Sequence, residues 1–167
     1  MKKQGFTLIE LMVVIVIMGI LAAVAVPKLF GMIAKSKASE IGPAAGEYIK
    51  LQDAYISETG INIGSWKVIG YTMPSSTNFE YTEAMTAGAT VALATGQADA
   101  WKAKNYAALN ECGAGAIWSL SVLANTSSGG SATYNGKIAQ GASGAVSDCE
   151  VLNASFIKLD ADNDLTK

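Results

Sequence analysis

The clearest pattern along the chain is a block of hydrophobic residues close to its N-terminus. Residues 6–26 are almost wholly apolar, and only Thr7 and Glu10 interrupt them. As a helix this block is about 30 Å long, which is enough to cross the hydrocarbon core of a bilayer. Two lysines precede it, and the positive-inside rule therefore places the N-terminus in the cytoplasm. The pattern predicts a single membrane-spanning helix.

After this block the hydrophobic positions become periodic. Residues at three- and four-residue steps form one face, and charged residues occupy much of the other, which predicts an amphipathic helix over residues 27–59 that ends near Gly60. We expect Pro27, and the Gly42-Pro43 pair, to kink or loosen it, because proline lacks a backbone donor. The positions assigned to the buried face are Leu29, Ile33, Ile41, Ala45, Tyr48, Gln52 and Tyr55.

The remainder of the chain, residues 60–167, predicts one small globular domain. Its pattern indicates a helix over 98–109, strands over 117–124 and 151–159, and a loop over 125–131. The dipeptide Asn135-Gly136 indicates a hairpin turn. A long helix followed by three or four antiparallel strands is an α+β arrangement, in which the apolar face of the helix covers the sheet.

Composition narrows the function classes. All twelve basic residues are lysines, and the formal charge is -2, so the chain has no basic footprint for nucleic acid. The chain has no histidine, which removes the base of Ser-His-Asp and Cys-His catalysis and the commonest metal ligand. We find no catalytic constellation and therefore predict a protein that is not an enzyme and carries no cofactor.

The two cysteines, Cys112 and Cys149, stand far apart and lack metal-ligand spacing. In an exported protein such a pair predicts one disulfide, with two unpaired buried thiols as the alternative. The prediction therefore depends on whether the chain is exported.

Two processing schemes are compatible with the apolar block. An ordinary signal peptide would be cut at the small-residue site Ala23-Val24-Ala25, which would release a domain that begins at Val26. The second scheme cuts after Gly5 and retains the helix. It is favoured by Glu10, because a carboxylate in a membrane segment costs on the order of a few kcal/mol and is by default functional.

The string GFTLIE at residues 5–10, with the LMVVIVIMGILAAVAVPKL that follows, resembles the signature of type IV pilins and their pseudopilin relatives. In that family a membrane peptidase cleaves after the glycine and methylates the new N-terminal amine. The resemblance implies that residues 1–5 are a leader, that Phe6 becomes N-methylated, and that Glu10 pairs with the Phe6 amine of a neighbouring subunit during assembly. It also matches Pro27 to the proline that bends the family's helix.

The resemblance implies the pilin fold and a major structural subunit of a type IV pilus, used in adhesion or motility. Its expected partners are further copies of itself, the prepilin peptidase and methylase, the pilus assembly machinery, and the inner membrane before export to an extracellular filament. Pilins often enclose a displayed region within a disulfide, here residues 112–149. The alternatives are a pseudopilin of a type II secretion system and, in another class, a secreted enzyme or binding domain.

Two further groups of residues are candidate sites. The C-terminal run Asp160, Asp162 and Asp164 resembles the start of a calcium loop but lacks the later glycine and glutamate, so a solvated acidic tail is the alternative and no metal site is assigned. The three tryptophans fit either an adhesive surface or the core, and the core is the commoner place for aromatics.

Overall fold

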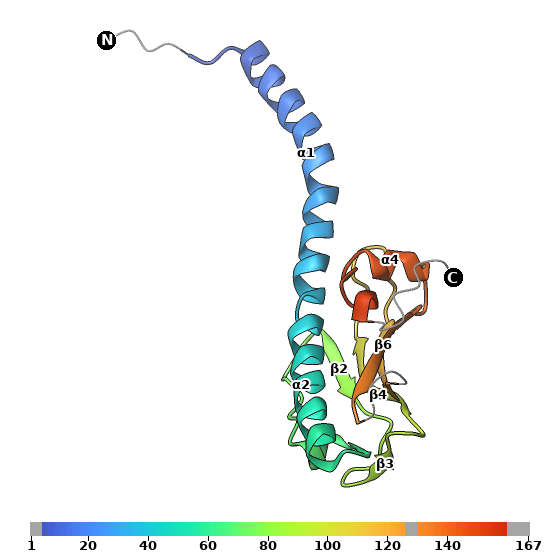
Figure 1. Cartoon of the computed structure of the whole chain (residues 1–167). Coiled ribbons are helices and arrows are strands. Elements are labelled where there is room, and N and C mark those ends of the chain that lie inside the picture. The colour runs from blue at the N-terminus through green and yellow to red at the C-terminus, as the bar shows by residue number, and fades with distance from the viewer. Residues whose placement is uncertain (1–4, 126–129, 160–167) are drawn as a thin grey trace.

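A computed structural model describes residues 5–125 and 130–159 of the chain (Figure 1). Two helices follow one another at the start, α1 (Leu8–Ala38) and α2 (Ile41–Thr59). A domain of short strands lies beside α2, while most of α1 extends away from that domain (Figure 1). The architecture is α+β and consistent with the pilin fold, as predicted.

Helix α1 forms because its sequence is a long run of residues with few polar interruptions, and because Thr7 caps its first turn. Pro27 lies inside α1, and the helix continues through it with a gentle curve along its length (Figure 1). Every residue from Gly5 to Phe30 is exposed. This half of the molecule therefore has no hydrophobic core of its own.

Ser39 and Glu40 separate the two helices. Pro43 has no backbone N–H, so it cannot donate the bond that a continuous helix would direct to the carbonyl of Ser39. The chain turns tightly here, with the Glu40 N–H donating to the Lys37 carbonyl at 3.4 Å. The interruption lies where the Gly42-Pro43 pair was expected to loosen the helix.

Helix α2 presents one face to the strands. Ile41, Ala45, Tyr48 and Gln52 are buried, as the periodicity predicted. Leu29 and Ile33 were wrongly assigned to that face. They are 54% and 44% exposed, and Ala34 is the first residue of the helix that is buried against the domain. The predicted end at Gly60 is confirmed, since Gly60 adopts a φ of 76° and donates its N–H to the Ile56 carbonyl at 2.7 Å.

The main sheet has four antiparallel strands: β2 (Phe79–Thr82), β4 (Gln97–Asn105), β5 (Ile117–Ala124) and β6 (Ala132–Ala139). Their order across the sheet is β2-β4-β5-β6, so β2 is an edge strand. A second sheet pairs β1 (Asn62–Gly64) with β3 (Thr90–Ala92). Short helices complete the domain: α3 (Trp66–Ile69), α4 (Val146–Glu150) and a 3-10 turn (Ile157–Leu159).

Aromatic side chains fill the space between α2 and the main sheet. Trp101 and Trp118 are fully buried, and Trp66 is nearly so, which confirms that the tryptophans belong to the core. Tyrosine hydroxyls tie the helix to the domain: Tyr71 donates to the Ala44 carbonyl at 3.2 Å, and Tyr134 donates to the Asp53 carboxylate at 2.6 Å. The domain thus holds α2 by both packing and hydrogen bonds.

The predicted strand at 117–124 is confirmed as β5, but the predicted helix over 98–109 is wrong. That segment is mostly β4. Its alanines and lysines favour a helix by propensity. However, Trp101 and Ala103 alternate with Lys102 and Lys104, and the buried pair faces the core between two neighbouring strands.

The Asn135-Gly136 hairpin turn is also wrong, because both residues lie within β6 opposite Ser121 and Leu120. Glycine at position 136 lets β6 pack closely against the backbone at Phe156, because a Cβ here would lie 2.5 Å from the Phe156 carbonyl oxygen. Of the predicted loop over 125–131, only Asn125, Gly130 and Ser131 are described, and the Asn125 N–H donates to the Ser131 carbonyl at 2.9 Å.

The predicted strand over 151–159 is instead a series of turns that ends in the 3-10 turn. Asn153 starts the turn that leads to Phe156: its side-chain oxygen accepts from the Ser155 hydroxyl at 2.9 Å, and its carbonyl accepts from the Phe156 N–H at 3.0 Å. The turns direct Phe156 into the core against Trp101, with ring centroids 6.2 Å apart. A strand would have placed the ring elsewhere.

Candidate functional site

The first candidate site is the start of α1, where the sequence placed Gly5, Phe6 and Glu10. Gly5 and Phe6 precede the helix and are exposed, Phe6 at 81%. A Cβ added at Gly5 would meet nothing within 4 Å, and its φ lies outside the range that favours glycine. The fold of this chain therefore does not require glycine at position 5. The peptide bond between Gly5 and Phe6 is non-helical and accessible.

Glu10 is not an unpartnered charge in the single subunit. One of its carboxylate oxygens accepts from the Thr7 N–H at 2.8 Å and from the Thr7 hydroxyl at 2.5 Å. The Thr7 hydroxyl oxygen accepts in turn from the Glu10 N–H at 3.3 Å. This reciprocal arrangement is a capping box, and it also places the negative charge at the positive end of the helix dipole.

The role of Thr7 was missed in the reading of the sequence. Its signal was present, because Thr7-Leu8-Ile9-Glu10 matches the S/T-x-x-E pattern of a capping box before an apolar run. Phe6 and Glu10 line the same shallow groove on α1, together with Val13 and neighbouring residues. The geometry thus brings the predicted cleavage position, the capping threonine and the carboxylate onto one end of one helix.

Helix α1 is long and apolar enough to cross a membrane. The most apolar stretch of the helical region Leu8–Thr59 has none of its residues buried against the rest of the protein. Its exposed side chains include Leu11, Ile15 and Leu21, each more than half exposed. An apolar surface of this extent needs a partner outside the chain, either lipid or protein.

The second candidate site is the disulfide region of the domain. Cys112 and Cys149 form a disulfide, which confirms the predicted pairing. Both residues are buried, and the bond ties the loop after β4 to helix α4. Gly113 packs closely beside it, since a Cβ there would lie 2.0 Å from the Ser143 carbonyl oxygen. The residues between the two cysteines include β5 and β6.

A polar clamp that the sequence did not reveal joins the helix interruption to the domain. The two carboxylate oxygens of Glu40 accept from the Ser76 hydroxyl at 2.8 Å and from the Asn78 side-chain amide at 2.7 Å. The Ser76 hydroxyl oxygen also accepts the Phe79 N–H at 3.1 Å, at the first residue of β2. We call Glu40, Ser76 and Asn78 the Glu40 clamp.

Among the residues that the structure describes, no group of three or more His, Cys, Asp or Glu side chains is arranged to hold a metal ion. Asp160, Asp162 and Asp164, the weak calcium candidate, lie outside the described residues. So do residues 1–4 of the expected leader.

Comparison with known proteins gives the class of the N-terminal segment. Residues 1–26 match the family model of the prokaryotic N-terminal methylation motif. The chain is 34% identical over 87 residues to the type IV major pilin protein PilA of Myxococcus xanthus, a match that covers 52% of this chain and 40% of the relative.

Two further relatives agree. The type IV major pilin protein PilE1 of Neisseria gonorrhoeae is 46% identical over 65 residues, 38% of this chain and 36% of the relative. The fimbrial protein EcpC of Eikenella corrodens is 46% identical over 59 residues, 35% of this chain and 39% of the relative. The matches therefore span two fifths or less of these relatives' length. No solved structure matches the chain significantly.

The methylation motif and the named relatives support the type IV pilin family for this chain, and the resemblance seen in GFTLIE is confirmed.

Proposed function

We propose that this chain is the major structural subunit of a type IV pilus, made as a membrane-anchored precursor and polymerised through its N-terminal helix. The observation that carries the proposal is the exposure of every residue from Leu8 to Phe30, in a helix whose last turns pack against a well-packed domain. Such a helix has a partner in lipid before assembly and in other helices afterwards. The relatives named as major pilins support the same conclusion.

The proposed processing step is cleavage between Gly5 and Phe6, followed by N-methylation of Phe6. Two observations support it: the matched motif covers these residues, and the bond is exposed outside the helix. The competing signal-peptide site Ala23-Val24-Ala25 lies inside α1 without any interruption of the helix. In the proposed scheme the peptidase, and not the fold, requires glycine at position 5.

The proposed assembly step gives Glu10 a second partner beside Thr7. After cleavage the Phe6 amine is cationic and lies one residue before the N-cap, Thr7. The positive end of the helix dipole is close by and disfavours this positive charge. The Glu10 carboxylate of an adjacent subunit would neutralise that charge. One Glu10 oxygen accepts from Thr7, and the other is available for the contact. Two groups that are each costly in an apolar medium are then paired.

The proposed cellular course follows from this chemistry. The precursor spans the inner membrane once with its N-terminus in the cytoplasm, meets the prepilin peptidase and methylase there, and is then extracted by the assembly machinery into an extracellular homopolymer. No observation favours the pseudopilin alternative, since the curated relatives reported above are named as pilins or fimbrial proteins.

The cleavage proposal is tested with Gly5→Val, with Gly5→Ala as the conservative control. Because the fold tolerates a side chain at this position, both variants should insert and fold alike. We expect Gly5→Val to accumulate as uncleaved precursor, visible by intact mass and N-terminal sequencing, while the alanine variant is processed. Mature protein that begins at Phe6 in the valine variant would refute the role of Gly5, and a start at Val26 in the wild type would refute the scheme.

The assembly proposal is tested with Glu10→Ala and Glu10→Gln. The glutamine keeps an oxygen that can accept from Thr7 but carries no charge, so it separates capping from ion pairing. We expect both variants to be cleaved and neither to enter sheared filaments, whereas Glu58→Ala, an exposed acid on α2, assembles as the wild type does. Normal filament yield from Glu10→Gln would assign Glu10 to capping alone.

A further inference from the structure

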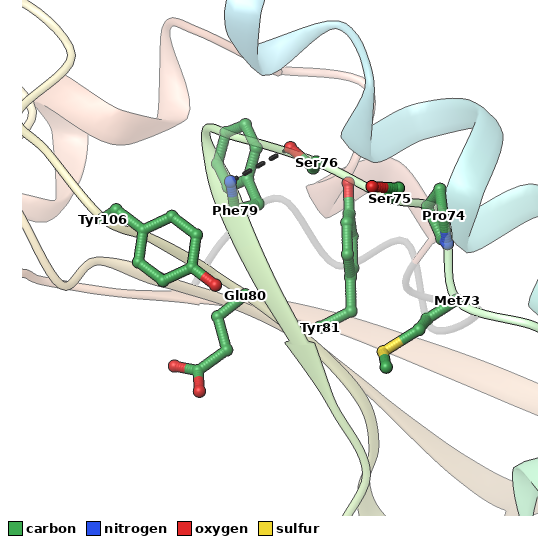
Figure 2. A pocket seen from close by; sticks show the side chains of 8 residues that line it. All are labelled: Met73, Pro74, Ser75, Ser76, Phe79, Glu80, Tyr81 and Tyr106. Atoms are coloured by element: carbon green, nitrogen blue, oxygen red, sulfur yellow. Dashed lines mark hydrogen bonds between the residues drawn. The ribbon is translucent and has the colours of Figure 1, made fainter.

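The free edge of β2 forms one side of a cup-shaped depression that none of the sites above uses. We call this depression the β2 cup. It has a volume of about 480 Å3 and is lined by residues 73–76, by β2 residues Phe79–Tyr81 and by Tyr106 (Figure 2). Figure 2 shows Tyr106 and Glu80 on one side of the strand and Met73 and Pro74 on the other. The Glu40 clamp holds one wall, through Ser76.

The β2 cup carries polar groups without partners in the described chain. Glu80 is exposed, and no ion pair or hydrogen bond engages its carboxylate. Lys104 lies opposite Glu80 in β4, but its side chain lies over Gly115, where its Cε is 3.8 Å from the position of a Cβ. The Tyr81 hydroxyl is buried without a hydrogen-bond partner, in a residue only 6% exposed.

These groups suit a cation that carries an apolar stem. Glu80 provides the opposite charge, and the face of the 60% exposed Tyr106 ring provides cation-π attraction. Methylene groups of a long side chain pack well on Met73 and Pro74. Since this chain has no arginine, the cation from a second copy would be a lysine ammonium.

Positive and negative residues are concentrated in different parts of the chain, as a charge-paired contact between two copies requires. Residues 11–39 contain three lysines, Lys28, Lys35 and Lys37, and no acidic residue. Residues 40–159 contain ten acidic residues against six lysines. In a polymer whose helices run parallel and staggered, the helix of one subunit passes the domain of another, so a positive segment meets a negative one.

The three lysines do not lie on one side of α1. Ala34 and Ala38 are buried against the domain and mark the side of the helix that faces it. At about 100° per residue, Lys35 and Lys37 lie on opposite sides of this buried face. Lys37 lines a groove with Ala108 to Asn110, the loop that begins beside Tyr106, so it lies on the flank of the β2 cup. Lys35 lies on the other flank, and Lys28, about two turns earlier, shares its side.

A head-to-tail polymer joins two different patches on each subunit. We propose that the β2 cup of one subunit receives the lysine face formed by Lys28 and Lys35 on the helix of an adjacent copy. This contact rests on the proposed function, because it requires a filament. It is distinct from the pairing at Glu10, since both of its patches lie outside residues 6–26.

The test uses the full chain in a strain that assembles its filaments. Glu80→Cys is combined in turn with Lys28→Cys, Lys35→Cys and Lys37→Cys, and sheared filaments are oxidised, digested and searched for linked peptides. We expect links between subunits at Lys35 or Lys28, and none at Lys37, which is the matched control on the opposite flank. Absence of links at both Lys28 and Lys35, or a link at Lys37 alone, would overturn the contact.

Charge exchange gives a second measurement. We expect Glu80→Lys and Lys35→Glu each to lower filament yield roughly twofold to fivefold, the range for a partly exposed ion pair, and the double exchange to restore it. Glu58→Lys controls for a general charge effect. Equal yields from all four variants would contradict the proposal even with filaments intact. A wild type that forms no filaments would instead overturn the proposed function, and this contact with it.

Discussion

The two halves of this molecule differ in whether their hydrophobic side chains are buried or exposed. In the domain, apolar side chains such as Phe79 and Leu120 are buried against one another and against α2. In the first part of α1, side chains of the same kind, such as Ile15 and Leu21, are more than half exposed. The domain therefore buries its own apolar side chains, whereas the apolar surface of the helix needs a partner outside the chain, either lipid or protein. A single chain can combine a stable fold with a large exposed apolar surface by keeping the two in separate segments.

Removal of the disulfide should produce the largest change in stability on the domain side of this comparison. In the loop-entropy model, a bond between residues 37 positions apart stabilises by about 4 kcal/mol, a large share of a small domain's stability. We expect Cys112→Ser with Cys149→Ser to lower the unfolding midpoint sharply while cleavage after Gly5 continues. Tryptophan fluorescence is a suitable readout, because Trp66, Trp101 and Trp118 all lie in the domain. Unchanged unfolding would show that the bond does not support the fold.

A matched pair of isoleucines tests the comparison directly. Ile56 in α2 is 2% exposed and Ile15 in α1 is 57% exposed. We expect Ile56→Ala to destabilise the domain by about 3 kcal/mol, as for other buried isoleucine truncations. Ile15→Ala should change domain unfolding by less than about 0.5 kcal/mol, yet reduce filament yield. Chemical denaturation of detergent-solubilised protein, followed by tryptophan fluorescence, measures both. A similar loss from both substitutions would mean that the halves are not independent.

A smaller effect is expected from alkaline pH, again confined to the domain. Burial raises the pKa of Tyr134, and the hydrogen bond to the Asp53 carboxylate raises it further. Burial also raises the pKa of Tyr48 and Tyr81. A raised folded pKa means that the stabilisation is complete below the unfolded value of about 10 and is lost as pH rises above it.

We therefore expect constant domain stability from pH 7 to about pH 9 with respect to these tyrosines, and a decline above about pH 10. Tyr134→Phe removes one titrating group and its hydrogen bond, which costs about 1 kcal/mol at neutral pH and makes the alkaline decline shallower. Urea unfolding at a series of pH values is the measurement. An alkaline decline in Tyr134→Phe as steep as that of the wild type would argue against a contribution from this residue.

The helical half could be predicted from the sequence because its signals are local. Apolar runs, the end at Gly60 and the loosening near Pro43 depend on residues within a few turns. The domain was harder, since its errors came from distant contacts. Gly136 serves close approach to Phe156, twenty residues later, so its apparent turn signal was misleading. The strand at β4 depends on pairing with β2 and β5, which overrides the helical preference of its alanines and lysines.

The candidate site residues likewise fall into those with a local sequence signal and those without one. Gly5, Phe6 and Glu10 were assigned to the candidate site from one short motif, and the capping role of Thr7 could have been predicted from its spacing to Glu10. The Glu40 clamp could not, because the partners of Glu40 are 36 and 38 residues away in a segment without a recognisable pattern. Long-range polar contacts of this kind require the fold before they can be identified.

The placement of the disulfide has a mechanical consequence. If the chain is stretched along a filament, tension enters through α1 and passes to the domain through α2. Cys112 and Cys149 both come later in the chain than the two helices, and so their bond does not reinforce the junction between α1 and α2. The load falls first on Ser39 and Glu40, where the helical hydrogen bonds are interrupted and the Glu40 clamp joins the rod to β2. A stretched chain would therefore yield at this junction before the segment between the two cysteines is disturbed.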